Sequence, residues 1–218
     1  MRWAPNHLPD IALALGQHLL LVAVSVAIAL VFALVAGIWS AHRPRAYAAI
    51  LFLTGILFVI PSLAMFALLI PILGLGFKPA IVGLTSYCLL ILTRNVVLGL
   101  RAVSPDIADA ALGLGYGPAR RLIEIELPIA LPFIVAGLRV AIVTIIGVAT
   151  VAAYINAGGL GTIIFAGIDQ RYPEKIMVGG GLTALMAITA DLLLSRAERR
   201  LRGRSGRGSS SERGGRTA

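Results

Sequence analysis

Few residues in this sequence could carry out chemistry, and their spacing does not group them. The three histidines lack the short spacing of metal ligands, which indicates interfacial or solvated positions for His7, His18 and His42. Four serines in or beside apolar runs have no adjacent base to activate them, namely Ser25, Ser40, Ser62 and Ser86. Asp191 alone cannot form a carboxylate pair, and no G-x-x-x-x-G-K-[ST] phosphate loop occurs. The sequence therefore predicts no catalytic residue, no metal site and no cofactor of its own.

The composition is that of an integral membrane protein. Of the 218 residues, 58% are hydrophobic and only 13% are charged, and the mean hydropathy is +0.92. The net charge of +9 would suggest nucleic acid as a partner in a soluble protein, but 8 of the 19 basic residues lie from Arg196 onward. We therefore expect a basic tail and no nucleic-acid partner. The single cysteine, Cys88, cannot form an internal disulfide.

Five apolar runs are long enough to cross a bilayer, which takes roughly 20 helical residues. The predicted fold is all-α, a polytopic transmembrane domain over residues 1–196 with spans at about 12–40, 47–72, 80–100, 129–154 and 176–195. The first run is too long for a signal peptide and is interpreted as a retained helix. Residues 197–218 are rich in Arg, Gly and Ser and are predicted to be a disordered basic tail.

Residues 104–128, the polar segment, separate the third span from the fourth. Ser104, Pro105 and Asp106 form a helix start, because they supply a cap, a first-turn proline and a carboxylate at the positive end of the dipole. The glycines of Gly115-Tyr116-Gly117 allow a sharp turn. Pro118 can then begin a second short helix. The alternative is an ordinary amphipathic loop between two spans.

The polar segment resembles the cytoplasmic loop of the permease subunits of bacterial ABC importers. That loop reads Glu-Ala-Ala, three residues, Gly, nine residues, then Ile-x-Leu-Pro. The matching positions here are Asp109, Ala110, Ala111, Gly115, Ile125, Leu127 and Pro128, with Asp in place of Glu. The resemblance implies the type I importer permease fold with a cytoplasmic coupling helix. It also implies an ABC ATPase subunit that docks on this loop and binds the ATP, leaving this chain without enzymatic activity.

Three charges interrupt the predicted spans: Arg94, Arg139 and Asp191. Charged side chains within a bilayer pair with one another, line a polar cavity, or extend to the interface. We expect Asp191 to pair with Arg139 or Arg94 and to fix helix packing near the inner face. For Arg94, extension to the interface is favoured.

The basic residues outside the spans predict the orientation. With the N-terminus outside, the cytoplasmic side receives thirteen basic residues and the outside receives four. This orientation places the polar segment and the C-terminus in the cytoplasm. The predicted location is therefore the bacterial cytoplasmic (inner) membrane, in a multi-pass arrangement.

Two short motifs are candidates for the translocation pathway. Pro61 and Ser62 predict a kink in the second span, which would either line the pathway or only improve packing. A glycine-rich turn opens the connection that runs to about residue 175, and its gate or docking candidates are Asn156, Gly158, Gly159 and Gly161. The alternative for this turn is a simple surface loop.

The run Ile142–Ile168, with Arg94-Asn95, resembles permeases that import osmoprotectants such as glycine betaine, choline and carnitine. The alternative is a methionine-type amino-acid importer permease. The resemblance implies a separate extracytoplasmic binding protein and a second permease subunit, identical or paralogous, in the lipid bilayer. The scattered aromatic residues form no box for a quaternary ammonium, so we expect solute capture to belong to the binding protein. A passive channel and a purely structural membrane subunit are the other classes considered.

Overall fold

The computed structural model describes residues 3–205, which form helices joined by short turns, with no strand among them. A short 3-10 turn, η1 (Ala4–His7), leads into α1 (Leu8–Ser40), which has no charged residue after Asp10. At 1.5 Å per residue its 33 residues are about 50 Å long, which exceeds the hydrocarbon thickness of a bilayer. The predicted all-α class is confirmed for the described residues.

Four helical stretches are long and apolar enough to cross a membrane, and a fifth results only if one bent pair is counted as a single span. The pair is α2 (Pro44–Val59) and α3 (Ser62–Leu73), whose axes differ by 97°. The kink predicted at Pro61 and Ser62 is therefore present, but it is a break between two helices and not a bend within one helix over 47–72. Pro61 cannot donate a backbone hydrogen bond and holds Ile60 in an extended conformation, so the helix breaks there. Pro71 lies inside α3 and does not end it.

The break at Pro61 leaves the carbonyl of Ile60 without a helical partner. The hydroxyl of Tyr87, on α4 (Phe77–Arg101), donates a hydrogen bond to this carbonyl. Backbone polar groups at membrane depth must be satisfied within the protein, so Tyr87 stabilises the bend.

The segment from Pro118 to Ile155 is one continuous helical stretch. It consists of α6 (Pro118–Arg121), a π-helical turn η2 (Leu122–Glu126), α7 (Leu127–Val151) and a 3-10 turn η3 (Ala152–Ile155). The predicted short second helix is thus the first part of the fourth span. The wide turn of η2 lies directly before Pro128, whose ring does not fit a regular α-helical turn.

Two predictions about the C-terminal third need correction. The connection predicted over residues 156–175 contains a ten-residue helix, α8 (Leu160–Asp169). The last helix, α9, spans Pro173–Ser205, so residues 197–205, predicted to be disordered, are helical. Arg, Ala, Glu and Leu favour helices, and Glu198 contacts Arg139 on α7, which ties this extension to the bundle. Residues 206–218 of the predicted tail lie outside the described part.

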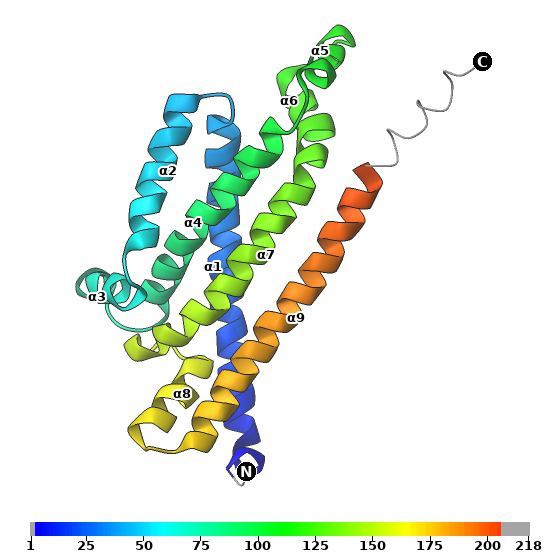
Figure 1. The fold of residues 1–218 in the computed structure, drawn as a ribbon. Coiled ribbons are helices and arrows are strands. Elements are labelled where there is room, and N and C mark those ends of the chain that lie inside the picture. Colours follow the sequence, from blue (N-terminus) through cyan, green and yellow to red (C-terminus); the bar gives the residue numbers. More distant parts are fainter. Residues whose placement is uncertain (1–2, 206–218) are drawn as a thin grey trace.

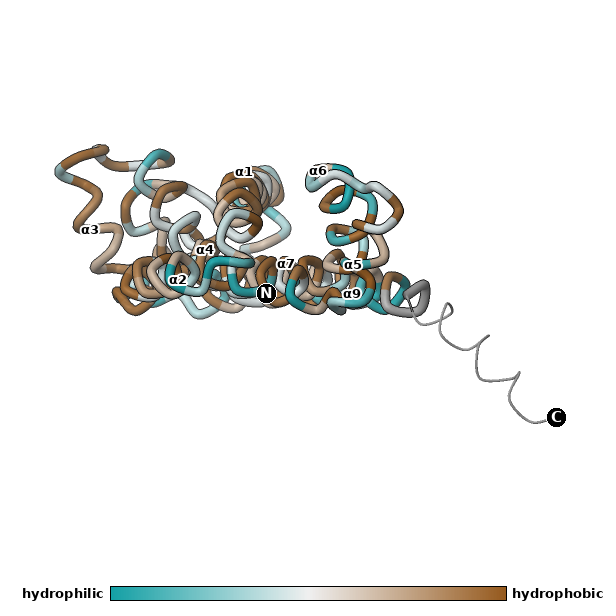
Figure 2. Tube along the Cα trace, turned by 90° about the horizontal axis from the view of Figure 1, so that it is seen from above, coloured by the Kyte–Doolittle hydropathy of each residue, from teal (hydrophilic) through white to brown (hydrophobic). Residues whose placement is uncertain are grey.

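The helices form a row with α1 on one side (Figures 1 and 2). In the row, α4 packs between α2 and α7, and α9 packs on the other side of α7. α1 packs across α4 and α7, and the core between them contains fully buried Leu21, Phe66, Leu84 and Ile145. The N-terminal end of α1 and α8 lie at one end of the bundle, and the polar segment lies at the other (Figure 1).

Candidate functional site

The polar segment folds into a helix and a sharp turn. In α5 (Pro105–Gly113), the hydroxyl of Ser104 accepts a hydrogen bond from the backbone N–H of Ile107 at 3.4 Å, so the predicted cap is confirmed. After the helix, Gly115 has φ +79°, a left-handed conformation that favours glycine. The backbone N–H of Tyr116 then donates to the carbonyl of Ala111 at 3.0 Å, which closes the turn.

The polar segment exposes apolar side chains at this end of the molecule. Leu114 is 78% exposed, and Ile107, Leu112 and Ile123 are also exposed, whereas Ala111 is buried. Asp109 and Ala110 lie on the exposed side of α5. Apolar side chains that gather outside the membrane-spanning helices are typical of a surface that contacts another protein.

Asp109 borders a polar cavity of about 390 Å³ whose lining includes His42, Arg101, Arg121 and Glu126. Arg121 forms an ion pair with the buried Glu126, with 2.8 Å between Nε and Oε1. Sequence reasoning did not identify the roles of Arg101, Arg121 and Glu126. No motif could have shown that they meet, because they come from two helices that the turn brings together.

Contacts with the helix bundle hold the polar segment in place on both sides, beginning with Arg101, just before it. Arg101 donates from Nε to the carbonyl of Ala41 at 2.9 Å and lies over the ring of Tyr47. Leu127 packs against a buried cluster that contains Val96, Leu100 and Ile134. Ile125 is half-buried and Pro128 is exposed at the start of α7. A force on α5 would therefore reach α1, α4 and α7.

The glycine-rich turn before α8 is a packed junction at the opposite end from the polar segment. Gln17 Oε1 accepts a hydrogen bond from the N–H of Gly159 at 3.0 Å. His18 Nδ1 accepts from the N–H of Leu160 at 3.2 Å, so two side chains of α1 cap the start of α8. Asn156, Gly158 and Gly159 all have positive φ. Gly158 has φ +82°, and a Cβ there would lie 2.5 Å from Gln17 Oε1, so a side chain would strain the backbone and displace Gln17.

His18 is fully buried, which corrects the prediction of an interfacial or solvated position. Its Nε2 lies 3.0 Å from the carbonyl of Ile146 on α7. Because the N–H of Leu160 can only donate, Nδ1 is the acceptor and the proton is assigned to Nε2. One neutral imidazole thus joins α1, α7 and α8. The other two histidines lie nearer the surface, since His7 stacks on Trp3 and His42 is exposed.

We predict that His18→Leu lowers the stability of the assembled protein. The substitution leaves the buried N–H of Leu160 unpaired, at about 1–3 kcal/mol, and removes the second hydrogen bond to the carbonyl of Ile146. Thermal unfolding of the purified protein in detergent measures the effect. His42→Leu is the matched control, because His42 is exposed. Equal midpoints for the two variants would contradict a stabilising role for His18.

The two other pathway candidates, Pro61 and Ser62, lie at the bend between α2 and α3. Pro61 is exposed and Ser62 is half-buried. The helix that begins at Ser62, α3, packs against η3, the turn that leads into Asn156.

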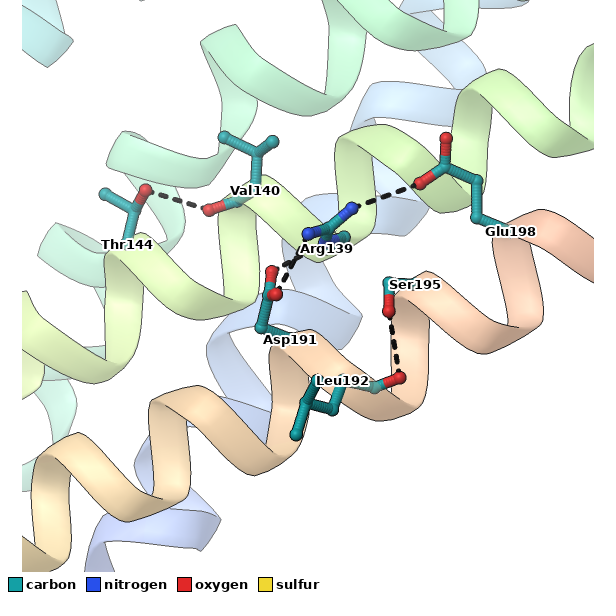
Figure 3. Close-up of polar contacts among 7 residues, drawn as sticks. All are labelled: Arg139, Val140, Thr144, Asp191, Leu192, Ser195 and Glu198. Carbon is teal, nitrogen blue, oxygen red and sulfur yellow. Dashed lines mark hydrogen bonds and ion pairs between the residues drawn. The ribbon is translucent and has the colours of Figure 1, made fainter.

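Of the three charges within the spans, the structure brings two together. Arg139 donates from Nε to Asp191 Oδ1 at 2.6 Å and from Nη2 to Oδ2 at 2.9 Å (Figure 3). Arg139 Nη1 also lies 3.6 Å from Glu198 Oε2. The predicted pairing of Asp191 with Arg139 is confirmed. Arg94 is exposed and does not take part in this cluster.

Comparison with known proteins assigns the family. Residues 15–203 match the family described as "Binding-protein-dependent transport system inner membrane component". The chain belongs to this family. It is therefore a permease component of such a transport system.

Relatives of known assignment cover most of the chain. The choline transport system permease protein OpuBB of Bacillus subtilis is 36% identical over 85% of each chain. The carnitine transport permease protein OpuCB of Listeria monocytogenes is 34% identical over 85% of each chain. The osmoprotectant import permease protein OsmW of Salmonella typhimurium is 35% identical, over 84% of this chain and 87% of that one.

The solved structure of the MetNI methionine ABC transporter in an inward-facing conformation confirms the fold. It superposes with a TM-score of 0.79 over 90% of this chain and 98% of that chain, at 22% identity. This likeness establishes the predicted type I importer permease fold and, at that identity, the fold alone.

Proposed function

We propose that this chain is the transmembrane permease subunit of an ATP-driven importer for osmoprotectants that carry a quaternary ammonium group. The observation that carries the proposal is the identity of 33–37% to permeases described for choline, carnitine and glycine betaine, over about 85% of the chain. The methionine-type alternative has only the more distant likeness of fold in its favour.

The family supports the proposed partners, and the geometry of the two ends suggests where each of them binds. An ABC ATPase subunit docks on the polar segment through the exposed faces of Asp109, Ala110 and the apolar side chains beside them, and it binds the ATP. The other motif residues stabilise the conformation of this surface and connect it to α7. They are Ala111, Gly115, Ile125, Leu127 and Pro128. An extracytoplasmic binding protein delivers the solute at the other end, beside α8. A second permease subunit, identical or paralogous, completes the assembly.

The proposed orientation has the N-terminus outside and the C-terminus in the cytoplasm, which follows the distribution of basic residues. In this orientation the ATPase-facing surface lies in the cytoplasm. Movement of the ATPase subunits upon ATP binding then shifts the helices between states that open to opposite sides. Such coupling requires contacts that differ between the two states.

Reconstitution tests this proposal directly. The permease, its ATPase and its binding protein are placed in lipid vesicles, and uptake of radiolabelled choline and glycine betaine is measured with and without ATP. We expect ATP-dependent and binding-protein-dependent uptake that excess unlabelled methionine does not compete with. Uptake without nucleotide would indicate a channel or secondary transporter. Competition by methionine would support the amino-acid alternative and contradict the proposal.

A further inference from the structure

The two sides of the α7–α9 pair differ sharply in polarity. On the side of α1, two neighbouring cavities of about 350 and 370 Å³ share Leu19, Met186 and Ala190 in their linings. Apart from the hydroxyl of Thr189, these linings contain only apolar side chains. α7 contributes Leu138, Ile142 and Ile146, which recur every four residues along one helical face. This side suits the hydrocarbon of lipid.

The opposite side of the same helix pair is polar. A cavity of about 480 Å³ opens there, and its lining consists of Ala136, Arg139, Val140, Val143, Thr144, Asp191 and Glu198. Figure 3 shows Arg139, Val140, Thr144, Asp191 and Glu198 from this lining. The side chains of Arg139 and Asp191 are 35% and 38% exposed, and that of Glu198 is 15% exposed. α1 does not contribute to this lining. The charged groups therefore lie on a surface that the described helices leave open.

The depth of this surface argues against contact with lipid. Arg139 lies twelve residues into α7, about 18 Å along its axis, and Asp191 lies four residues before the end of the predicted span 176–195, so the pair is within the spans, toward the end of the bundle that carries the polar segment. Charged side chains at such a depth are costly in hydrocarbon and face a water-filled cavity or other protein. Asp191 holds the guanidinium through two hydrogen bonds, which keeps Arg139 at this depth instead of extended to the interface.

We propose that the open α7–α9 face, centred on Arg139, Asp191 and Thr144, is a water-contacting wall of the translocation pathway. This inference rests on the proposed transport function. The residues of this face lie outside the loop motif of the polar segment, and the comparison with relatives gives them no role. Two carboxylates, of Asp191 and Glu198, face the single guanidinium of Arg139, so the cluster carries one net negative charge. This charge favours a quaternary ammonium group, a cation that cannot form hydrogen bonds. The groove on the α1 side faces lipid.

The reactivity of single introduced cysteines tests whether this face contacts water. Cys88 is the only cysteine in the sequence and is buried, so Cys88→Ala provides a background without reactive thiols. Thr144→Cys places a thiol in the polar cavity, and Ile142→Cys places one in the apolar groove on the same helix, two residues away. Both positions are half-buried, which makes Ile142→Cys a matched control. Val140→Cys is a second probe of the polar cavity in case Thr144→Cys does not assemble.

The complex with its ATPase and binding protein is treated in vesicles with a charged, membrane-impermeant methanethiosulfonate on both sides of the membrane. We expect Thr144→Cys to react at least about tenfold faster than Ile142→Cys, because the reaction needs a hydrated thiolate. Saturating choline should slow the reaction at Thr144 during turnover. Negligible rates at both positions would overturn the proposal, since they mean that lipid or the second permease covers this face. Equal rates would overturn it as well, since water would then reach the apolar groove as readily as the polar cavity. An unchanged rate with choline would overturn the contact with solute.

The outcome is separable from that of the proposed function. If uptake of choline occurs but neither Thr144→Cys nor Val140→Cys reacts, the proposed function stands and the wall is placed wrongly. If Thr144→Cys reacts but no osmoprotectant is taken up, the wall stands and the proposed solute class is wrong.

Discussion

Replacing Gly115 with valine should uncouple ATP hydrolysis from transport. Gly115 has φ +79°, and a β-branched residue there is strained by about 1–3 kcal/mol, which corresponds to roughly 5- to 150-fold in the population of this turn. An added Cβ would meet no atom within 4 Å, so the effect acts through the backbone and not through packing. We expect uptake to fall by a factor in this range while the ATPase retains its basal hydrolysis rate.

Two controls separate backbone strain from other effects. Gly113→Val makes the same change two residues earlier, at a glycine that also has open space around it but does not have a positive φ. Gly115→Asn introduces a side chain that tolerates the left-handed conformation. Both variants should transport nearly as well as the parent protein. If Gly115→Val retains normal uptake in reconstituted vesicles, the polar segment does not transmit motion through this turn.

The sequence predicted the polar segment well because its signals are local. A capping serine, a first-turn proline and a glycine at the turn each act within a few residues, and the structure has the cap at Ser104 and the left-handed turn at Gly115. The pairing of Asp191 with Arg139 was also predictable, because a bilayer leaves few other partners for a charge within a span.

The parts that the sequence did not predict depend on contacts between distant residues. Leu160–Asp169 is too short to span a membrane and follows a glycine-rich turn, so its sequence reads as a loop. The N–H groups of Gly159 and Leu160 at its start donate to Gln17 and His18, which are 142 residues away. The same distance explains why His18 was assigned to the surface. The 97° bend at Pro61 exceeds an ordinary kink, and the hydroxyl of Tyr87 on another helix satisfies the freed carbonyl.

The continuous stretch from Pro118 to Ile155 connects the two ends of the molecule. Its first turn belongs to the polar segment, and its last turn leads into the junction at Asn156. In between, Arg139 joins it to α9, and Ile146 joins it to His18. A shift of the polar segment can therefore reach the wall at Arg139 and the α8 junction through one helix. Both contacts would then differ between transport states, which coupling requires.

Gly161→Ala should prevent α8 from packing against the end of α7. A Cβ at residue 161 would lie 1.9 Å from the carbonyl oxygen of Thr150 and 2.8 Å from the Cβ of Ala153. The clash with Thr150 involves backbone, so α8 must move away from the end of α7. Overpacking of this kind costs about 1–3 kcal/mol and occasionally more. The movement would also stretch the hydrogen bond from Leu160 to His18.

We expect Gly161→Ala to lower the unfolding midpoint of the purified protein by about 2–4 °C for each kcal/mol lost in a chain of this size. Transport should fall with it, because α8 lies at the end proposed to receive the binding protein. Gly180→Ala is the matched control, since a Cβ at that position in α9 meets no atom within 4 Å and alanine favours a helix. If Gly161→Ala and Gly180→Ala unfold at the same temperature, α8 does not need its close approach to α7. The glycine-rich turn would then be a surface loop after all, and a gate at this end of the pathway would have to be sought elsewhere.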